Sequence, residues 1–146
     1  MEEKQQRAQT GGITLRTVNE FGFTTEMHDV WSCDAIVPLI DGKPLTELID
    51  AFETRANMKP AGEMYGGFTS EARDAHSFRP GKSRVVLACS CGDTGCWPLL
   101  ADIGVDGDTI VWNGFRQPRR KDRDYSGFGP FRFDRAQYGK ALSELV

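Results

Sequence analysis

The sequence predicts an α+β domain in which an antiparallel sheet of about five strands packs against two amphipathic helices. Three patterns favour this class: a three-stranded meander over residues 84–115, and helical stripes at about 44–55 and 135–145. Hydrophobic residues make up 39% of the 146 positions, so we expect a single globular domain over residues 13–146. Residues 1–12 are polar and end in two glycines, which is typical of a disordered tail.

The meander is the best-defined part of this pattern. Its strands are expected at Arg84–Cys91, Cys96–Val105 and Asp108–Phe115. The dipeptide Asp106-Gly107 is typical of a tight hairpin between the second and third strands. One face of the hairpin is apolar, and we assign it to the core: Trp97, Leu99, Ala101, Ile103, Ile110 and Trp112.

The turn also predicts a register for this hairpin. We expect Ile103 to pair with Ile110, and Ala101 to pair with Trp112. Because side chains alternate along a strand, Phe115 is expected on the opposite face, beside the cysteines.

Both helices are expected from apolar spacing and from their start signals. Pro44 follows an Asp-Gly turn and occupies the expected first position of a helix. Its apolar stripe is Leu45, Leu48, Ile49 and Phe52. Its opposite face is expected to be solvated: Glu47, Asp50, Glu53 and Arg55. Asp134 and Gln137 have the spacing of a capping box. The second stripe is Tyr138, Ala141, Leu142 and Leu145.

The remaining segments are less regular. Strands are expected at Ile13–Val18, within Asn19–His28 and at Val30–Ile40, where Pro38 favours an edge or a bulge. The segment Ala56–Ser83 has no periodicity, and an irregular connection of this length is either functional or mobile.

Three of the four cysteines lie within eight residues around a glycine-flanked turn: Cys89, Cys91 and Cys96. If residues 92–95 form the loop, alternation along the strands places the three sulfurs on one face. This cluster is the clearest candidate for chemistry in the sequence.

Three interpretations of the cluster stay open. A zinc site would use its three thiolates with Cys33, His28 or His76 as the fourth ligand. A disulfide between Cys91 and Cys96 would serve redox chemistry. The third interpretation is a group of buried thiols that only fill space, which the lack of a C-x-x-C motif favours.

The cysteine cluster also belongs to a resemblance. It forms the motif CxCGxxGCWPL at residues 89–99, and DYSGxGPFxFDRAQY follows at residues 124–138, with DGKPL at residues 41–45. In these motifs the chain resembles a group of small uncharacterised bacterial proteins that have no assigned activity. The match runs from about Val30 to the end, apart from the irregular middle. The resemblance implies a bacterial, cytoplasmic protein and no particular reaction.

A cationic segment follows the meander. Residues 116–123 carry five positive charges, and aromatic residues flank them. The candidate binding residues are Arg116, Arg119, Arg120, Arg123, Tyr125 and Phe128. Arginine and aromatic side chains are typical anchors for a protein partner. The net charge of −3 and the neighbouring Asp122 and Asp124 argue against nucleic acid.

Several function classes lack support in the sequence. No apolar run approaches the ~20 residues of a membrane helix, and no secretory leader pattern is present, so we expect a cytoplasmic protein without membrane association. Phosphate-binding, dinucleotide-binding and hydrolase motifs are missing, and neither histidine lies in a catalytic pattern. We therefore expect a non-enzymatic binding domain with no catalytic residue, whose partner is another protein or a small ligand. The alternative is a zinc-binding or thiol-dependent protein that uses the cysteine cluster.

Overall fold

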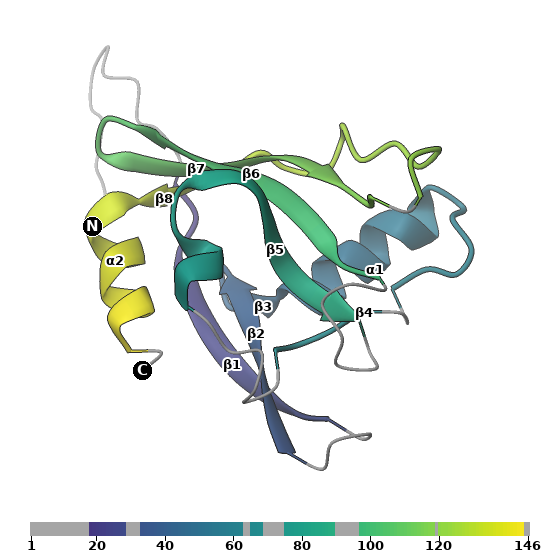
Figure 1. Ribbon diagram of the computed structural model, residues 1–146, viewed down its shortest axis with the longest axis horizontal. Helices are drawn as coiled ribbons and strands as arrows, with labels where there is room; N and C mark the ends of the chain where they lie inside the picture. Colours follow the sequence, from purple (N-terminus) through teal and green to yellow (C-terminus); the bar gives the residue numbers. More distant parts are fainter. Residues whose placement is uncertain are drawn as a thin grey trace, which may run out of the picture.

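The computed structural model describes residues 18–28, 33–62, 65–68, 75–89, 97–118 and 120–144. The larger antiparallel sheet has the order β4 (Tyr65–Gly66), β5 (Gly81–Cys89), β6 (Leu99–Asp106), β7 (Thr109–Arg116) and β8 (Phe131–Asp134) (Figure 1). The smaller sheet has the order β1 (Phe21–His28), β2 (Cys33–Ile40) and β3 (Lys43–Pro44). The helices are α1 (Leu45–Arg55), α2 (Arg135–Ser143) and a short 3-10 turn, η1 (Ala75–Phe78). The expected α+β class is therefore confirmed.

The two sheets share one hydrophobic core, and α1 and α2 lie at opposite sides of it (Figure 1). Trp112 on β7 is completely buried, and its Nε1–H donates to the hydroxyl of Tyr138 on α2 at 3.0 Å. The ring of Phe21 on β1 lies 5.4 Å from the Trp112 ring, so the smaller sheet meets the larger one here. Among the described residues, no helix has the length and apolarity that a membrane crossing requires.

The hairpin of β6 and β7 forms, but with a register two residues away from the expected one. Its loop residues are Gly107 and Asp108, and Ile103 pairs with Trp112 and not with Ile110. A shift of two residues leaves each side chain on its expected face, because side-chain direction alternates with a period of two. The predicted apolar face is accordingly buried.

A bulge in β7 overturns the expected position of Phe115. Between Leu100 and Asp102 the ladder shifts, so that β7 has one more residue than β6 in this interval. Gly114 lies in the bulge with φ of +66°, a conformation that favours glycine. The bulge places the ring of Phe115 in the core, 6.5 Å from that of Trp112, and not on the opposite face.

The smaller sheet accommodates Pro38 inside its central strand. On the side of β2 that faces away from β1, Ile36 exchanges two backbone hydrogen bonds of 2.8 Å with Phe68. Pro38 lies two residues further on, so its nitrogen points to the same side, where β3 no longer runs alongside. Because proline has no N–H to donate, this position costs no bond to β1.

The helix α2 begins at its expected N-cap, but the expected capping box does not form. The backbone N–H of Gln137 donates to Asp134 Oδ2 at 2.9 Å, as a cap requires. The side chain of Gln137 instead binds the backbone of Phe21, where Oε1 accepts from the N–H at 2.9 Å and the amide donates to the carbonyl. Of the predicted stripe, Tyr138 and Ala141 are buried and Leu142 is half-buried, while Leu145 lies outside the described residues.

The segment expected to be irregular, residues 56–83, contributes to the core. Tyr65, Phe68 and Phe78 are all buried, and β4 pairs with the end of β5. The expected strand over residues 13–18 falls outside the described residues except for Val18, and the expected tail lies outside them altogether.

Candidate ligand-binding groove

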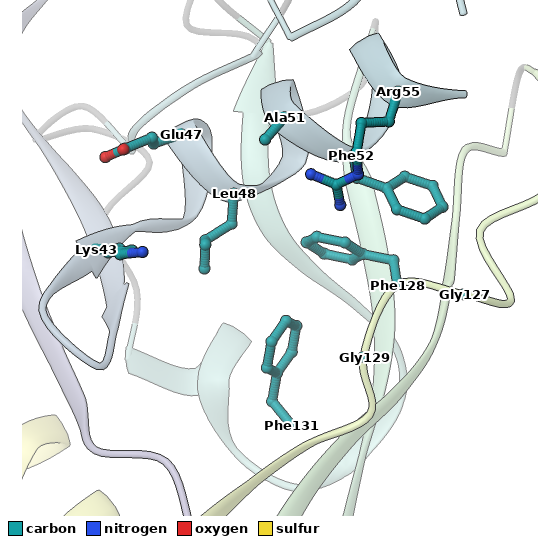
Figure 2. A pocket seen from close by; sticks show the side chains of 10 residues that line it. All are labelled: Lys43, Glu47, Leu48, Ala51, Phe52, Arg55, Gly127, Phe128, Gly129 and Phe131. Carbon is teal, nitrogen blue, oxygen red and sulfur yellow. The ribbon is translucent and has the colours of Figure 1, made fainter. Parts of the chain in front are cut away.

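An open groove of about 360 Å³ lies between α1 and residues 127–131 (Figure 2). Its floor is apolar and consists of Leu48, Phe52, Phe128 and Phe131. The ring of Phe128 lies 5.3 Å from those of both Phe52 and Phe131. Phe128 is buried and the other two rings are half-buried, so the floor is anchored in the core and open to solvent above.

Charged side chains stand at the rim of this groove. Figure 2 shows Lys43 and Glu47 at one end and Arg55 at the other, with the Arg55 guanidinium extending over the apolar floor. Within the part of the chain that the structure describes, none of these three side chains has a hydrogen-bond or ion-pair partner. The rim therefore offers two cations and one carboxylate to a ligand.

A buried carboxylate on α1 lies behind the groove. Glu53 was expected on the solvated face of the helix, but it has no exposed surface. It follows Leu45 and Ile49 at intervals of four residues, so it shares their core-facing side. The apolar pattern could not reveal this position, because Glu53 itself is charged.

Four donors converge on the Glu53 carboxylate. The backbone N–H of Gly62 donates to Oε1 at 2.6 Å. The hydroxyls of Tyr65 and Tyr125 donate to Oε2 at 2.7 and 2.5 Å, and Arg123 forms an ion pair with the same oxygen at 3.3 Å. A buried carboxylate is stable only when it is paired with a cation and its oxygens accept hydrogen bonds, as both do here.

Arg123 connects this network to the Pro60 carbonyl and to the ring of Trp97. Only 8% of its side chain is exposed, and it also donates to the Pro60 carbonyl at 2.9 Å. Its guanidinium lies 5.3 Å from the centre of the Trp97 ring, and that of Arg120 lies 4.3 Å from it. Burial alone would lower the pKa of Arg123, but the Tyr125 hydroxyl and the charge of Glu53 raise it, so the ion pair persists.

The tyrosine hydroxyls remain donors at physiological pH. Burial raises the pKa of Tyr65, and its contacts with Tyr125 and Glu53 raise it further. Burial and the bond to Glu53 likewise raise the pKa of Tyr125. The buried side chain of Gln117 donates an amide N–H to the Tyr65 hydroxyl, whose own proton goes to Glu53.

The arrangement suits positioning better than catalysis. Glu53 and both tyrosines are buried, so no reactant reaches the carboxylate in this conformation. What the network does is tie α1 to residues 120–125, and Tyr125 also stacks on Phe52 at 5.9 Å. The two walls of the groove are thereby fixed relative to each other.

The structure disperses the candidate binding residues. Tyr125 and Phe128 are buried, and Phe128 contributes to the groove floor. Arg123 belongs to the Glu53 network, and Arg116 pairs with Asp102 at 3.1 Å on the sheet. Arg120 is exposed above Trp97. Arg119 lies outside the described residues, so the predicted contact surface as a whole stays a prediction.

The groove residues on α1 escaped the sequence argument. Leu48 and Phe52 were assigned to the core stripe and Arg55 to the solvated face, while Lys43, just before the helix on β3, carries no pattern of its own. Nothing in the spacing of these residues marked them as a site.

The cysteine cluster lies mostly outside the described residues. The backbone of Cys89 ends β5 opposite Tyr65, and the backbone of Cys33 begins β2 opposite His28. Cys89 and Cys33 are therefore not paired with each other across a sheet. Cys91 and Cys96 are among the residues that are not described. Among the described residues, no group of three or more metal-ligating side chains is assembled. The shared face of the sulfurs and its three interpretations stay predictions.

Comparison with known proteins assigns no family to the chain. No protein-family model matches it, and searches of curated proteins and of solved structures return no match.

Proposed function

We propose that this protein is a non-enzymatic binding domain whose ligand site is the groove between α1 and residues 127–131. The observation that carries the proposal is an apolar floor open to solvent beneath a rim of unpaired charges. Small-molecule sites are typically concave and roughly 300–1,000 Å³ in volume, with a few polar groups that fix the orientation of the ligand. At about 360 Å³ the groove has room for a small ligand or for one side chain of a protein partner.

Preorganisation supports the same conclusion. The groove is built on a helix and on a segment that begins two residues after Tyr125, which the Glu53 network ties to that helix. Binding to such a surface does not have to order a loop first, which lowers the cost of association. The motif resemblance supports a bacterial and cytoplasmic setting for this domain.

Isotope-labelled protein and a library of small fragments test the proposal by NMR. Fragments should shift amide resonances in residues 43–55 and 127–131. Ala51 is an exposed helical alanine that lines the groove, so Ala51→Trp should fill the groove and abolish these shifts. Ala136 is an exposed alanine on α2, and Ala136→Trp is the matched control. Fragment binding that survives Ala51→Trp unchanged would exclude the groove as the site.

One observation keeps the zinc or thiol alternative in view. The backbone of Cys89 pairs with that of Tyr65, and the indole of Trp97 lies beside the Gln117 amide. Both ends of the segment 89–97, which contains the cysteine cluster, therefore adjoin residues of the Glu53 network. Metal analysis of the purified protein tests this alternative, together with thiol titration before and after unfolding. Stoichiometric zinc that is lost in Cys89→Ser would replace our proposal with the alternative.

A further inference from the structure

We infer that the groove selects an anionic ligand with an aromatic body, namely a single ring carrying a carboxylate, and that Arg55 binds the carboxylate. The inference rests on the proposed function, because it names the ligand class of the same groove. It adds the charge of the ligand and names Arg55 as the residue that binds the charged group.

The charge of the rim is the first argument. Lys43 and Glu47 stand together at one end of the groove, where their opposite charges offset each other (Figure 2). Arg55 stands alone at the other end, and no described residue pairs with its side chain. Two cations and one carboxylate leave a net charge of +1 on the lining, and this charge is concentrated at Arg55.

The chemistry of Arg55 is the second argument. A guanidinium presents a planar pair of N–H donors that matches a carboxylate and is always charged. In Figure 2 this group extends over the floor next to Phe52 and Phe128, and does not point away from the groove. An anion bound there would lie at the edge of an apolar surface, where attraction is stronger than in bulk water.

The floor supplies the third argument. Phe128 and Phe131 meet edge to face, with an angle of 78° between their planes, and Phe52 lies tilted to Phe128. A further ring placed on the half-buried Phe52 and Phe131 continues the same edge-to-face packing. The volume of about 360 Å³ suits one ring with a short acid chain.

Three probes with the same body and different charges test the inference: hydrocinnamate, hydrocinnamyl alcohol and phenylpropylamine. Their affinities are measured by NMR titration of the labelled, full-length chain. Hydrocinnamate should bind about two- to fivefold more tightly than the alcohol, as an ion pair with an exposed arginine provides. The amine should bind more weakly than the alcohol.

Arg55→Gln should remove the preference for the anion and leave binding of the alcohol unchanged. Arg55→Lys should retain part of the preference, because lysine keeps the positive charge but lacks the planar pair of N–H donors. Arg135→Gln changes an exposed arginine on α2, outside the groove, and is the matched control, which should leave the preference for the anion unchanged. Arg55 and Arg135 are both exposed, so these variants are expected to fold, which thermal unfolding verifies.

The outcomes separate this inference from the proposed function. If the three probes bind the groove equally, or if Arg55→Gln keeps the preference, the ligand class is wrong while the groove remains a binding site. If no probe binds the groove but neutral fragments do, the ligand class is again wrong. If neither probes nor fragments bind there, both proposals fail.

Discussion

Replacing Glu53 by glutamine should destabilise the fold strongly, although the two side chains have nearly the same shape. The substitution exchanges one acceptor oxygen for an NH₂ group among donors, and it leaves the guanidinium of Arg123 without its counter-charge. Breaking a buried pair by removing one partner costs about 3–5 kcal/mol. Because Arg123 retains the Pro60 carbonyl and the Trp97 ring, we expect the lower end, about 3 kcal/mol. For a chain of this size that corresponds to a fall in Tm of roughly 10 °C.

Urea unfolding followed by tryptophan fluorescence measures this loss. Arg123→Met and the double variant complete a double-mutant cycle. The double variant should lose less stability than the sum of the single variants, because it leaves no buried charge unpaired. Glu47→Gln, on the exposed face of the same helix, should stay within about 0.5 kcal/mol of the wild type. A similarly small effect for Glu53→Gln would refute the role assigned to the network.

Three further predictions follow from single contacts. Burial raises the pKa of each of the three tyrosines, so the stability linked to them is complete below their usual value of 10.0 and is lost as pH rises above it. Tyrosinate absorbance should therefore appear only together with alkaline unfolding, and ionisation near pH 10 in the folded protein would contradict this. Phe128→Ala should cost about 3–4 kcal/mol in urea unfolding, because it removes a buried ring, whereas the half-buried Phe131→Ala should cost clearly less. Burial alone would raise the pKa of Asp102, but the Ser83 N–H and Arg116 lower it, so its stabilisation is present above 3.8 and lost as pH falls below this value. Asp102→Asn should make unfolding less sensitive to acid in that range, and an unchanged acid profile would count against the assignment.

Local patterns were enough to predict much of the fold. The Asp-Gly turn and the alternation of apolar residues located the hairpin, and the apolar face survived an error of two residues in its register because the faces repeat every second residue. The stripe that begins at Leu45 located α1, and Asp134 located the start of α2. These features depend on neighbours a few positions away.

The errors arose where a partner distant in the sequence decides the outcome. Gln137 was expected to cap its own helix, but its side chain binds Phe21, which lies 116 positions earlier. Glu53 was expected in solvent, and it is buried because Tyr125 and Arg123 meet it there. The bulge at Gly114 required the register of two strands before it could be seen.

The groove could not be predicted for a related reason. One wall comes from α1 and the other from residues 127–131, about 75 positions apart along the chain. Of the aromatic residues in the second wall, Phe128 was recognised as a candidate, but as part of a contact surface and not as the floor of a groove. Only the packing of the two segments turns Phe52 and Phe128 into one surface.

The bond between Gln137 and Phe21 gives the last helix a second role. One amide side chain imitates a neighbouring strand there, since it both accepts from and donates to the same peptide position. A fragment that ended before Arg135 would leave the N–H and the carbonyl of Phe21 unpaired at this edge of β1. The apolar surface that α2 covers would be exposed beside them. Unpaired strand edges of two molecules can pair with each other. The shortened protein should therefore self-associate through this edge, whereas in the full chain Gln137 occupies it.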